Sequence, residues 1–190
     1  MRIATIVEGH GECEAVPILI RRIAQRLGKA DPPEIDRPIR IPKSRLLKET
    51  GIERAVDLAA RLAGPDGRIL VLVDADDDCP AEVGPALLSR AKQSRYDRRI
   101  GVVLAKREFE AWFLAALPSL AGHRTISPGL PALREAELVR DAKGTLSSHM
   151  ESGYSPAIDQ ASLTTAFDLD LARATSSFDK CYREICRLLE

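Results

Sequence analysis

The sequence lacks an excess of charge of either sign, because 28 Lys and Arg residues are balanced by 28 Asp and Glu residues. A general attraction to nucleic acid through net charge is therefore not indicated, and such binding would need a local basic patch. Aromatic residues are also scarce, at 4% of the chain. This scarcity argues against a protein that binds single strands by stacking bases on aromatic side chains.

Long apolar runs are missing as well, since no stretch approaches the roughly 20 residues that a helix needs to cross a bilayer. The N-terminus turns directly into a strand pattern and then reaches Glu8, which is unlike a signal peptide. We therefore expect a cytoplasmic protein that does not bind membranes. The four cysteines form no Cys-x-x-Cys pair, so we interpret them as reduced packing residues rather than zinc ligands.

The first part of the chain contains a regular alternation of strand and helix patterns. Short apolar or alternating runs typical of strands occur at 3–7, 35–41, 69–73 and 100–105. Helical patterns follow them at 12–27, 51–63, 80–94 and 111–117. This order predicts an α/β fold, namely a Rossmann-like, mainly parallel four-stranded sheet flanked by helices.

Strand signals stop after residue 117. The rest of the chain, 118–190, is predicted to be a helical C-terminal extension packed on the 1–117 core. Its expected helices lie at 132–150, 157–166, 169–175 and 176–189. Trp112 and Phe113 are interpreted as core residues, and Ser176 and Ser177 as N-caps of the last helix.

One stretch combines a buried strand with a dense group of acids. The apolar run 69–73 is followed by Asp74, Asp76, Asp77 and Asp78. Like charges this close repel unless a cation lies between them, and hard oxygen ligands suit Mg2+ or Mn2+. The alternative is a solvated acidic turn that caps the next helix.

Acids also follow two other predicted strands. Because ligands of parallel sheets bind at the carboxyl ends of the strands, acids that leave three strands are expected at one edge. The predicted metal ligands are Glu8, Glu12, Asp74, Asp76, Asp78, Glu108 and Glu110. A shared Mg2+ or Mn2+ site explains this coincidence better than three separate solvated turns.

Val7-Glu8-Gly9 with Glu12, followed by Asp74-Ala-Asp76, resembles the TOPRIM domain of topoisomerases, bacterial primases and overcoming-lysogenization-defect nucleases. With Glu108-Phe-Glu110-Ala-Trp112 and Ser177-Phe178, nearly the whole chain is similar to the DUF4276 family. That TOPRIM-like group is often encoded beside an ABC-type ATPase, and some of its members act in phage defence. The resemblance implies a TOPRIM-type fold and Mg2+-dependent phosphoryl transfer.

The resemblance also implies roles for single residues. Glu8 is the TOPRIM glutamate, and Asp74 and Asp76 are its Asp-x-Asp pair. Glu12 matches a second acid of the nuclease branch, and the acids at 108 and 110 match later acids of the family. No tyrosine nucleophile stands obviously beside these residues, so topoisomerase activity is disfavoured.

A nuclease also needs a cation near the scissile phosphate and a basic surface for the backbone. Lys106 is the predicted cation, which completes a catalytic set with Glu8, Asp74 and Asp76; the alternative is a surface lysine at a helix start. The predicted nucleic-acid-binding residues are Arg37, Arg40, Lys43 and Arg45. The alternative for these is a solvated charged face.

The leading hypothesis is a Mg2+-dependent nuclease or nuclease-like effector that cleaves RNA or DNA phosphodiesters. The second is a non-catalytic partner or regulatory subunit that keeps the fold and docks on an ATPase. A receiver-like module is less favoured, because the helical tail is too long and Glu8-Gly9 replaces the expected acidic pair. The sequence is compatible with a homodimer.

Overall fold

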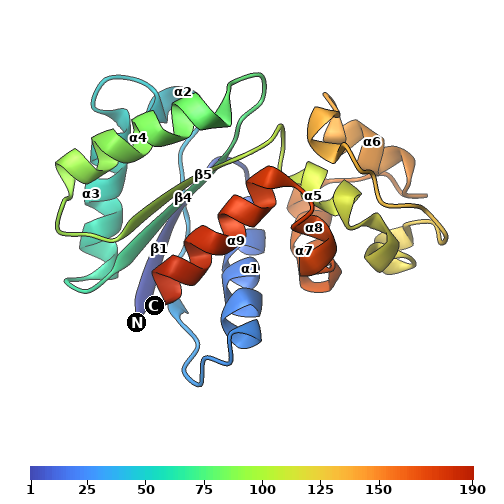
Figure 1. Cartoon of the computed structure of the whole chain (residues 1–190), viewed down its shortest axis with the longest axis horizontal. Coiled ribbons are helices and arrows are strands. Elements are labelled where there is room, and N and C mark those ends of the chain that lie inside the picture. The colour runs from blue at the N-terminus through green and yellow to red at the C-terminus, as the bar shows by residue number, and fades with distance from the viewer.

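The centre of the fold is one parallel sheet, and the computed structural model describes all 190 residues. The strand order is β2-β1-β4-β5, and β3 also pairs with β1. The strands are β1 (Arg2–Val7), β2 (Glu34–Ile35), β3 (Ile39–Arg40), β4 (Arg68–Asp74) and β5 (Ile100–Ala105). The predicted α/β class, a parallel sheet flanked by helices, is therefore confirmed (Figure 1).

The segment predicted as one strand over 35–41 forms two short strands instead. Ile35 pairs with Ile3 and Ile39 pairs with Ile6, so four residue steps on this segment oppose three on β1. The extra residue interrupts the ladder as a bulge does. Pro38 lies within the interruption and has no N–H to donate. The sheet accordingly has five strands rather than the predicted four.

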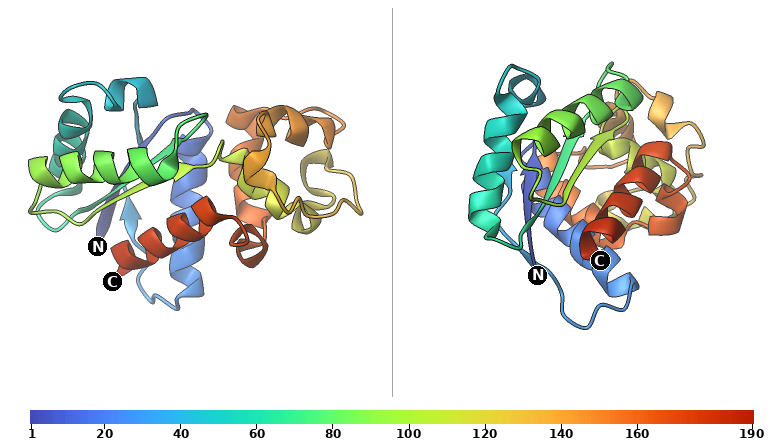
Figure 2. Two further views of the ribbon diagram at one scale, coloured as in Figure 1. Left: turned by 45° about the horizontal axis from the view of Figure 1, so that its top comes forward. Right: turned by 60° about the vertical axis from the view of Figure 1, so that its left-hand side comes forward.

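Helices cover both faces of the sheet, in agreement with the mainly apolar residues of its central strands. One face carries α1 (Glu12–Arg26) and α9 (Ser176–Leu189), and the other carries α3 (Gly51–Ala63) and α4 (Pro80–Ser94) (Figures 1 and 2). Successive strand residues face opposite sides. Ile3 and Val7 thus join the cluster under α1, whereas Ala4 and Ile6 join the cluster under α3.

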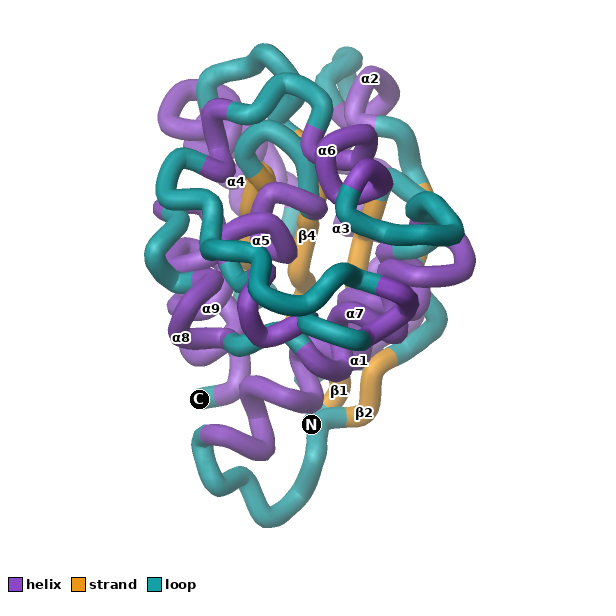
Figure 3. The backbone as a smooth tube through the Cα atoms, turned by 90° about the vertical axis from the view of Figure 1, so that its right-hand side faces the viewer, coloured by secondary structure: helices purple, strands orange, loops and turns teal.

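A group of short helices lies at the carboxyl ends of the strands (Figures 2 and 3). This helical group runs from α5 to α8, after which α9 returns to the sheet. Its α-helices are α5 (Glu110–Ala115), α6 (Ala142–Ser148), α7 (Ala161–Ala166) and α8 (Leu169–Ala172). Three 3-10 helices (Leu117–Leu120, His123–Thr125 and Ala136–Leu138) and a π-helix (Pro156–Gln160) complete it.

The long helix predicted over 132–150 is not continuous. A 3-10 turn ends at Leu138, and α6 begins afresh at Ala142. Asp141 starts α6 as its N-cap, because its side chain accepts a hydrogen bond from the Gly144 N–H at 2.8 Å. This cap fixes the position of α6 over the sheet edge, and α6 carries a residue of the site described below.

An aromatic cluster joins the helical group to the helix that returns to the sheet. It consists of Phe109, Trp112, Phe113, Phe167 and Phe178, with ring centroids 4.6 to 5.5 Å apart. All five rings are fully buried. The prediction that Trp112 and Phe113 are core residues is confirmed, and the few aromatic residues of the chain are largely used for packing.

The N-cap prediction for the last helix is wrong. Thr175 is the capping position of α9, and no side chain caps it. Ser177 is instead buried, and its Oγ accepts hydrogen bonds from Trp112 Nε1 at 2.8 Å and from the Lys106 N–H at 3.1 Å. The four cysteines are free thiols, but only Cys181 is buried, and the exposed Cys79 is not the packing residue that was predicted. None of the helices combines the length and the apolar character that crossing a membrane requires.

Candidate functional site

The carboxyl ends of β1 and β4 and the start of α5 open into one cavity of about 480 Å3, called here the acidic cavity. Figure 3 views the molecule from the side of the helical group that closes it. Carboxylates are its commonest lining side chains, and residues from the helical group form its outer wall. The lining residues are Glu8, Gly9, His10, Gly11, Glu12, Asp74, Asp76, Glu110, Lys143, Ser155, Pro156, Ala157 and Gln160.

The turn after β1 supplies two of these carboxylates. Glu12 Oε2 accepts hydrogen bonds from the N–H groups of Glu8 and Gly9, both at 2.8 Å. Burial raises the pKa of the Glu12 carboxyl above its ordinary value, and these two bonds offset the effect only in part. Glu8 Oε1 accepts from the Lys43 N–H at 3.0 Å, whereas Glu8 Oε2 is buried without a hydrogen-bond partner.

The ends of β4 and β5 supply the deepest carboxylates. Asp74 Oδ1 accepts from the Phe109 N–H at 2.8 Å. Glu110 is only 1% exposed, and its Oε1 accepts from the Tyr154 hydroxyl at 2.9 Å. Glu110 Oε2 makes no hydrogen bond. One oxygen of each carboxylate is thus held by a backbone or hydroxyl donor, and the other faces Lys143 Nζ, which lies 3.5 Å from Asp74 Oδ2 and 3.3 Å from Glu110 Oε2.

Lys143 of α6 enters the cavity from the opposite side. Its Nζ lies 3.3 Å from Glu110 Oε2, 3.5 Å from Asp74 Oδ2 and 3.7 Å from Glu108 Oε2. Its backbone N–H donates to Glu108 Oε2 at 3.0 Å. Although burial alone lowers the pKa of Lys143, the three carboxylates raise it above its ordinary value. The ammonium therefore acts as an internal counter-ion.

The charges of the acidic cavity are only partly balanced by this lysine. Burial raises the pKa of Asp74 well above its ordinary value, and the negative charges of Glu12 and Glu110 raise it further. Burial also raises the pKa of Glu110, against the opposing effect of Lys143. Such shifts indicate a surplus of negative charge in a poorly solvated place, which a divalent cation relieves.

The donor set fits a hard divalent cation such as Mg2+ or Mn2+. Glu8 Oε2 and Glu110 Oε2, which accept no hydrogen bond, are the oxygens that such an ion would use. No three acidic, His or Cys side chains are already grouped around one point at ligand distance. Lys143 stands among three of the acids, and its side chain is 42% exposed, so it has room to withdraw toward solvent.

Asp76, which lines the cavity, and Asp78, which does not, share a second lysine, Lys43. Lys43 Nζ lies 2.6 Å from Asp76 Oδ2 and 3.0 Å from Asp78 Oδ2, and it donates to Ala75 O at 2.7 Å. Asp76 has φ of 51°, in the left-handed region where Asp is one of the tolerated residues. Its N–H donates to Arg107 O at 2.9 Å. This lysine therefore fixes the turn after β4.

The structure brings most of the predicted site residues together. Glu8, Glu12, Asp74, Asp76 and Glu110 line the acidic cavity, and Glu108 reaches it through Lys143. Asp78 contacts Lys43 and does not line the cavity.

Lys106, the predicted cation, does not line the acidic cavity either. It lines a different cavity, beside β5, α4 and α9. The cationic side chain that does reach the carboxylates is Lys143.

The four basic residues predicted to contact nucleic acid do not form one set. Arg37, Arg40 and Arg45 are exposed, in agreement with a basic surface. Lys43 is only 8% exposed, because its ammonium lies against Ala75 O and the two aspartates. Its place is in the turn after β4 rather than on the basic surface.

Two residues of the site, Lys143 and Tyr154, were not predicted from the sequence. Both come from the helical group, where no strand marks an edge and no acid cluster draws attention. Lys143 follows the Asp141 cap by two positions, a spacing that predicts a helix start but not where its side chain points. Only the way the helical group folds over the sheet brings them to the acids.

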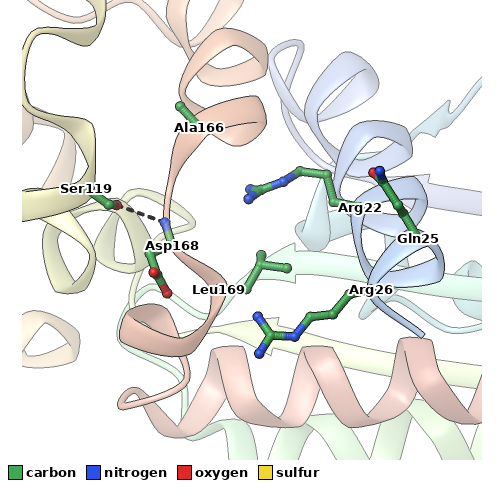
Figure 4. A pocket seen from close by; sticks show the side chains of 7 residues that line it. All are labelled: Arg22, Gln25, Arg26, Ser119, Ala166, Asp168 and Leu169. Carbon is green, nitrogen blue, oxygen red and sulfur yellow. Dashed lines mark hydrogen bonds between the residues drawn. The ribbon is translucent and has the colours of Figure 1, made fainter. Parts of the chain in front are cut away.

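A second cavity, of about 410 Å3, lies between α1 and the α7–α8 connection (Figure 4). Arg22 donates to Thr164 O at 2.8 Å, and its guanidinium carbon lies 5.2 Å from the centroid of the Phe167 ring. Arg26 pairs with Asp170 at 2.6 Å. The chain itself already engages these guanidinium groups. We therefore interpret the contacts around this cavity as packing of α1 against the helical group.

Comparison with curated proteins and with solved structures finds no match to the chain. A family match, in contrast, covers almost the whole fold, from the end of β1 to the last turns of α9. The match extends over residues 7–185 and therefore includes every residue of the acidic cavity. The chain belongs to the family described as "Domain of unknown function (DUF4276)".

Proposed function

We propose that the protein is a Mg2+- or Mn2+-dependent nuclease of the TOPRIM type, or a nuclease-like effector. The observation that carries the proposal is the acidic cavity. Acids from the ends of β1 and β4 and the start of α5 meet there, and Glu8 and Glu110 each keep one buried oxygen that accepts no hydrogen bond. The best use of such a set is to hold a divalent ion against phosphate oxygens.

The candidate ligands are the carboxylates that face the cavity, Glu8, Glu12, Asp74, Asp76 and Glu110. When bound, the ion supplies Lewis-acid stabilisation of the phosphate that is cleaved. The chain contributes orientation. The Phe109 N–H, the Gly9 N–H and the Tyr154 hydroxyl each hold one carboxylate in place.

Lys143 is the better candidate for the cation that faces the scissile phosphate. It is the lysine that lines the acidic cavity, and its exposed portion lets the ammonium move from the carboxylates toward a bound phosphate. In this proposal Lys143 takes over the role that the sequence suggested for Lys106.

The substrate backbone would lie along the exposed arginines near the exit of β1. Arg40 is in register with Val7, and the chain continues from it to Lys43, whose N–H holds Glu8. Arg37, Arg40 and Arg45 are therefore close in sequence to the rim of the cavity. Contacts to phosphates would position the strand without reading its sequence.

A second candidate function is that of a non-catalytic partner or regulatory subunit of an ABC-type ATPase. The observation that favours it is Lys143, which already neutralises part of the acidic cavity. An acidic site that is neutralised by a lysine of the same chain can have a structural role without a bound metal ion. An assay for cleavage with and without an added ABC-type ATPase from the same host separates the two functions.

The direct test combines a melting curve with a cleavage assay. We expect Mg2+ or Mn2+ to raise the melting temperature of the wild type and to support cleavage of labelled DNA or RNA. Asp74→Asn and Glu110→Gln are expected to remove both effects, because they delete the deepest ligands while keeping side-chain size. Glu14→Gln, an exposed acid of α1, is the matched control and should behave as wild type.

The two measurements separate the claims. A wild type whose melting temperature ignores both ions would refute the metal site. A wild type that binds the ion but cleaves neither DNA nor RNA, alone or with the ATPase, would favour the second function, that of a non-catalytic subunit.

A further inference from the structure

The free edge of the sheet carries a groove that the proposed nuclease site does not use. β5 is the last strand, and α4 and α9 extend past it on either side (Figures 1 and 2). Between them lies a cavity of about 400 Å3, called here the edge groove. Val102 and Leu104 of β5 form its floor.

The backbone of β5 has unused hydrogen-bonding groups along this groove. The Ile69 N–H donates to Arg99 O at 3.0 Å and the Ala75 N–H donates to Ala105 O at 2.8 Å. Alternate residues of a strand direct their N–H and C=O groups to the same side. Residues 99, 101, 103 and 105 therefore face β4, while Val102 and Leu104 direct theirs to the open edge.

Side chains of the protein cap this edge at both ends. Arg187 donates to Ile100 O at 2.7 Å, and Ser177 Oγ accepts from the Lys106 N–H at 3.1 Å. No comparable side-chain contact reaches Val102 or Leu104. Both are almost fully buried, at 1% and 4% exposure, so their backbone groups lie at the bottom of the groove and a segment reaches them by displacing side chains of its walls. Buried backbone groups without partners are costly, and a ligand that bonds to them would be stabilised.

The walls of the groove favour an extended and acidic ligand. On the α4 side, Ala81 and Gly84 are small residues that leave room beside the strand. On the other side stand Lys106, Lys180 and Arg183, and no acidic residue lines the groove. Lys180 and Arg183 pair within α9, with Glu184 and Asp179, but Lys106 has no ion pair.

We propose that the edge groove binds a short, extended, acidic segment of another protein by strand addition. The segment would lie beside β5 and exchange backbone hydrogen bonds with Val102 and Leu104. Its alternate side chains would meet the apolar floor and the three cations. This docking surface is independent of the metal site, and it extends the sheet by one strand.

The probe is a hexapeptide of alternating valine and glutamate with acetylated and amidated ends. We expect it to bind at submillimolar concentration and to slow amide hydrogen exchange at Val102 and Leu104 at least about tenfold. Exchange in the β1–β4 ladder should not change. Two control peptides are informative: one in which lysine replaces glutamate, and one with N-methylated alternate amides, which cannot complete the ladder.

Two variants at exposed positions of the groove test the surface. Ala81→Trp fills the groove from α4, and the double change Lys180→Glu with Arg183→Glu reverses its charge. Both should bind the peptide at least about tenfold more weakly while melting close to the wild type. A third variant, Arg21→Glu at an exposed position of α1, should bind the peptide as tightly as the wild type does.

The proposal is overturned by three outcomes. One is the absence of protection at Val102 and Leu104 at 1 mM peptide, and another is equal binding of the lysine peptide. The third is a wild-type dimer in sedimentation that Ala81→Trp dissociates, since a second copy of the chain would then be the occupant of the groove.

Discussion

Two lysines approach the acids at the edge of the sheet, and they do so in different ways. The side chain of Lys43 is 10% exposed and its Nζ makes close contacts, at 2.6 to 3.0 Å, with Asp76, Ala75 O and Asp78. The side chain of Lys143 is 42% exposed and its Nζ lies at 3.3 to 3.7 Å from three carboxylates. One lysine is fixed in the chain, and the other rests loosely among the acids.

The difference indicates that one lysine has a structural role and that the other can be replaced by a different cation. Lys43 bonds to a backbone carbonyl, so its loss leaves the turn after β4 without support. The Lys143 ammonium approaches only carboxylate oxygens, and one of these, Glu110 Oε2, lies 3.3 Å away and accepts no hydrogen bond. We infer that Lys43 serves the fold and that Lys143 holds a position which another cation can take.

The largest expected effect is on stability, from Lys43→Met. This change keeps the volume of the side chain but removes the bond to Ala75 O and the pairs with two aspartates. Because the aspartates are exposed, at 62% and 41%, the ion pairs count for little. The expected loss of unfolding free energy is about 1–3 kcal/mol, measured by denaturant unfolding.

The control for this variant is Lys48→Met, an exposed lysine close in the chain. It should change the unfolding free energy by less than about 0.5 kcal/mol. Equal stability of the Lys43 and Lys48 variants would contradict a structural role for Lys43.

The next effect is on ion binding, from Lys143→Met. Removal of a competing positive charge should strengthen Mg2+ or Mn2+ binding by about tenfold, which corresponds to about 1.4 kcal/mol. Isothermal titration measures this affinity directly, without an activity assay. If Lys143 also faces the phosphate, the same variant binds the ion more tightly and yet cleaves more slowly.

Arg140→Met is the matched control, because Arg140 is a nearby cation that reaches only Asp77, at 3.8 Å. It should leave the ion affinity within about twofold of the wild type. Weaker ion binding in Lys143→Met than in the wild type would show that the two cations do not compete.

The smallest effect is on the pH dependence of stability. The pKa values of Glu12, Asp74 and Glu110 are raised in the folded protein above the ordinary values of 4.5 and 3.8. The folded state therefore holds more protons than the unfolded state above about pH 4.5, and stability falls as the pH rises through the raised values. The metal-free protein should melt higher at about pH 5.5 than at about pH 8.

Saturating Mg2+ should flatten this dependence, because the ion stabilises the charged carboxylates. The Glu110→Gln variant should reduce the slope without any metal. A metal-free melting temperature that rises with pH over the same range would contradict the burial of uncompensated carboxyl groups.

The sequence was informative where local pattern determines position. Apolar runs located β1, β4 and β5, and the parallel arrangement implied that Glu8, Asp74 and Glu110 leave the sheet at one edge. The pattern was less informative about the direction in which a side chain points. Lys106 follows β5 directly, but its backbone faces the free edge and its side chain lines the edge groove.

The helical group explains the remaining differences. Its helices are short and are held by caps and an aromatic cluster, so their periodicity says little about which side chains reach the sheet. Lys143 and Tyr154 come to the acidic cavity only through this arrangement. Lys43 was similarly hidden, because its place under the turn after β4 depends on contacts 32 and 33 positions away in the chain.

The shared carboxylates give the molecule one further property. Glu108 and Glu110 leave the sheet edge, but their oxygens are bonded by the Lys143 N–H and the Tyr154 hydroxyl of the helical group. An ion that draws these oxygens inward works against the same bonds. Ion binding in the cavity and the docking of α6 on the sheet edge are then thermodynamically linked. A ligand or partner that binds the docked form of α6 changes the ion affinity by some factor, and the ion changes the affinity for that ligand by the same factor.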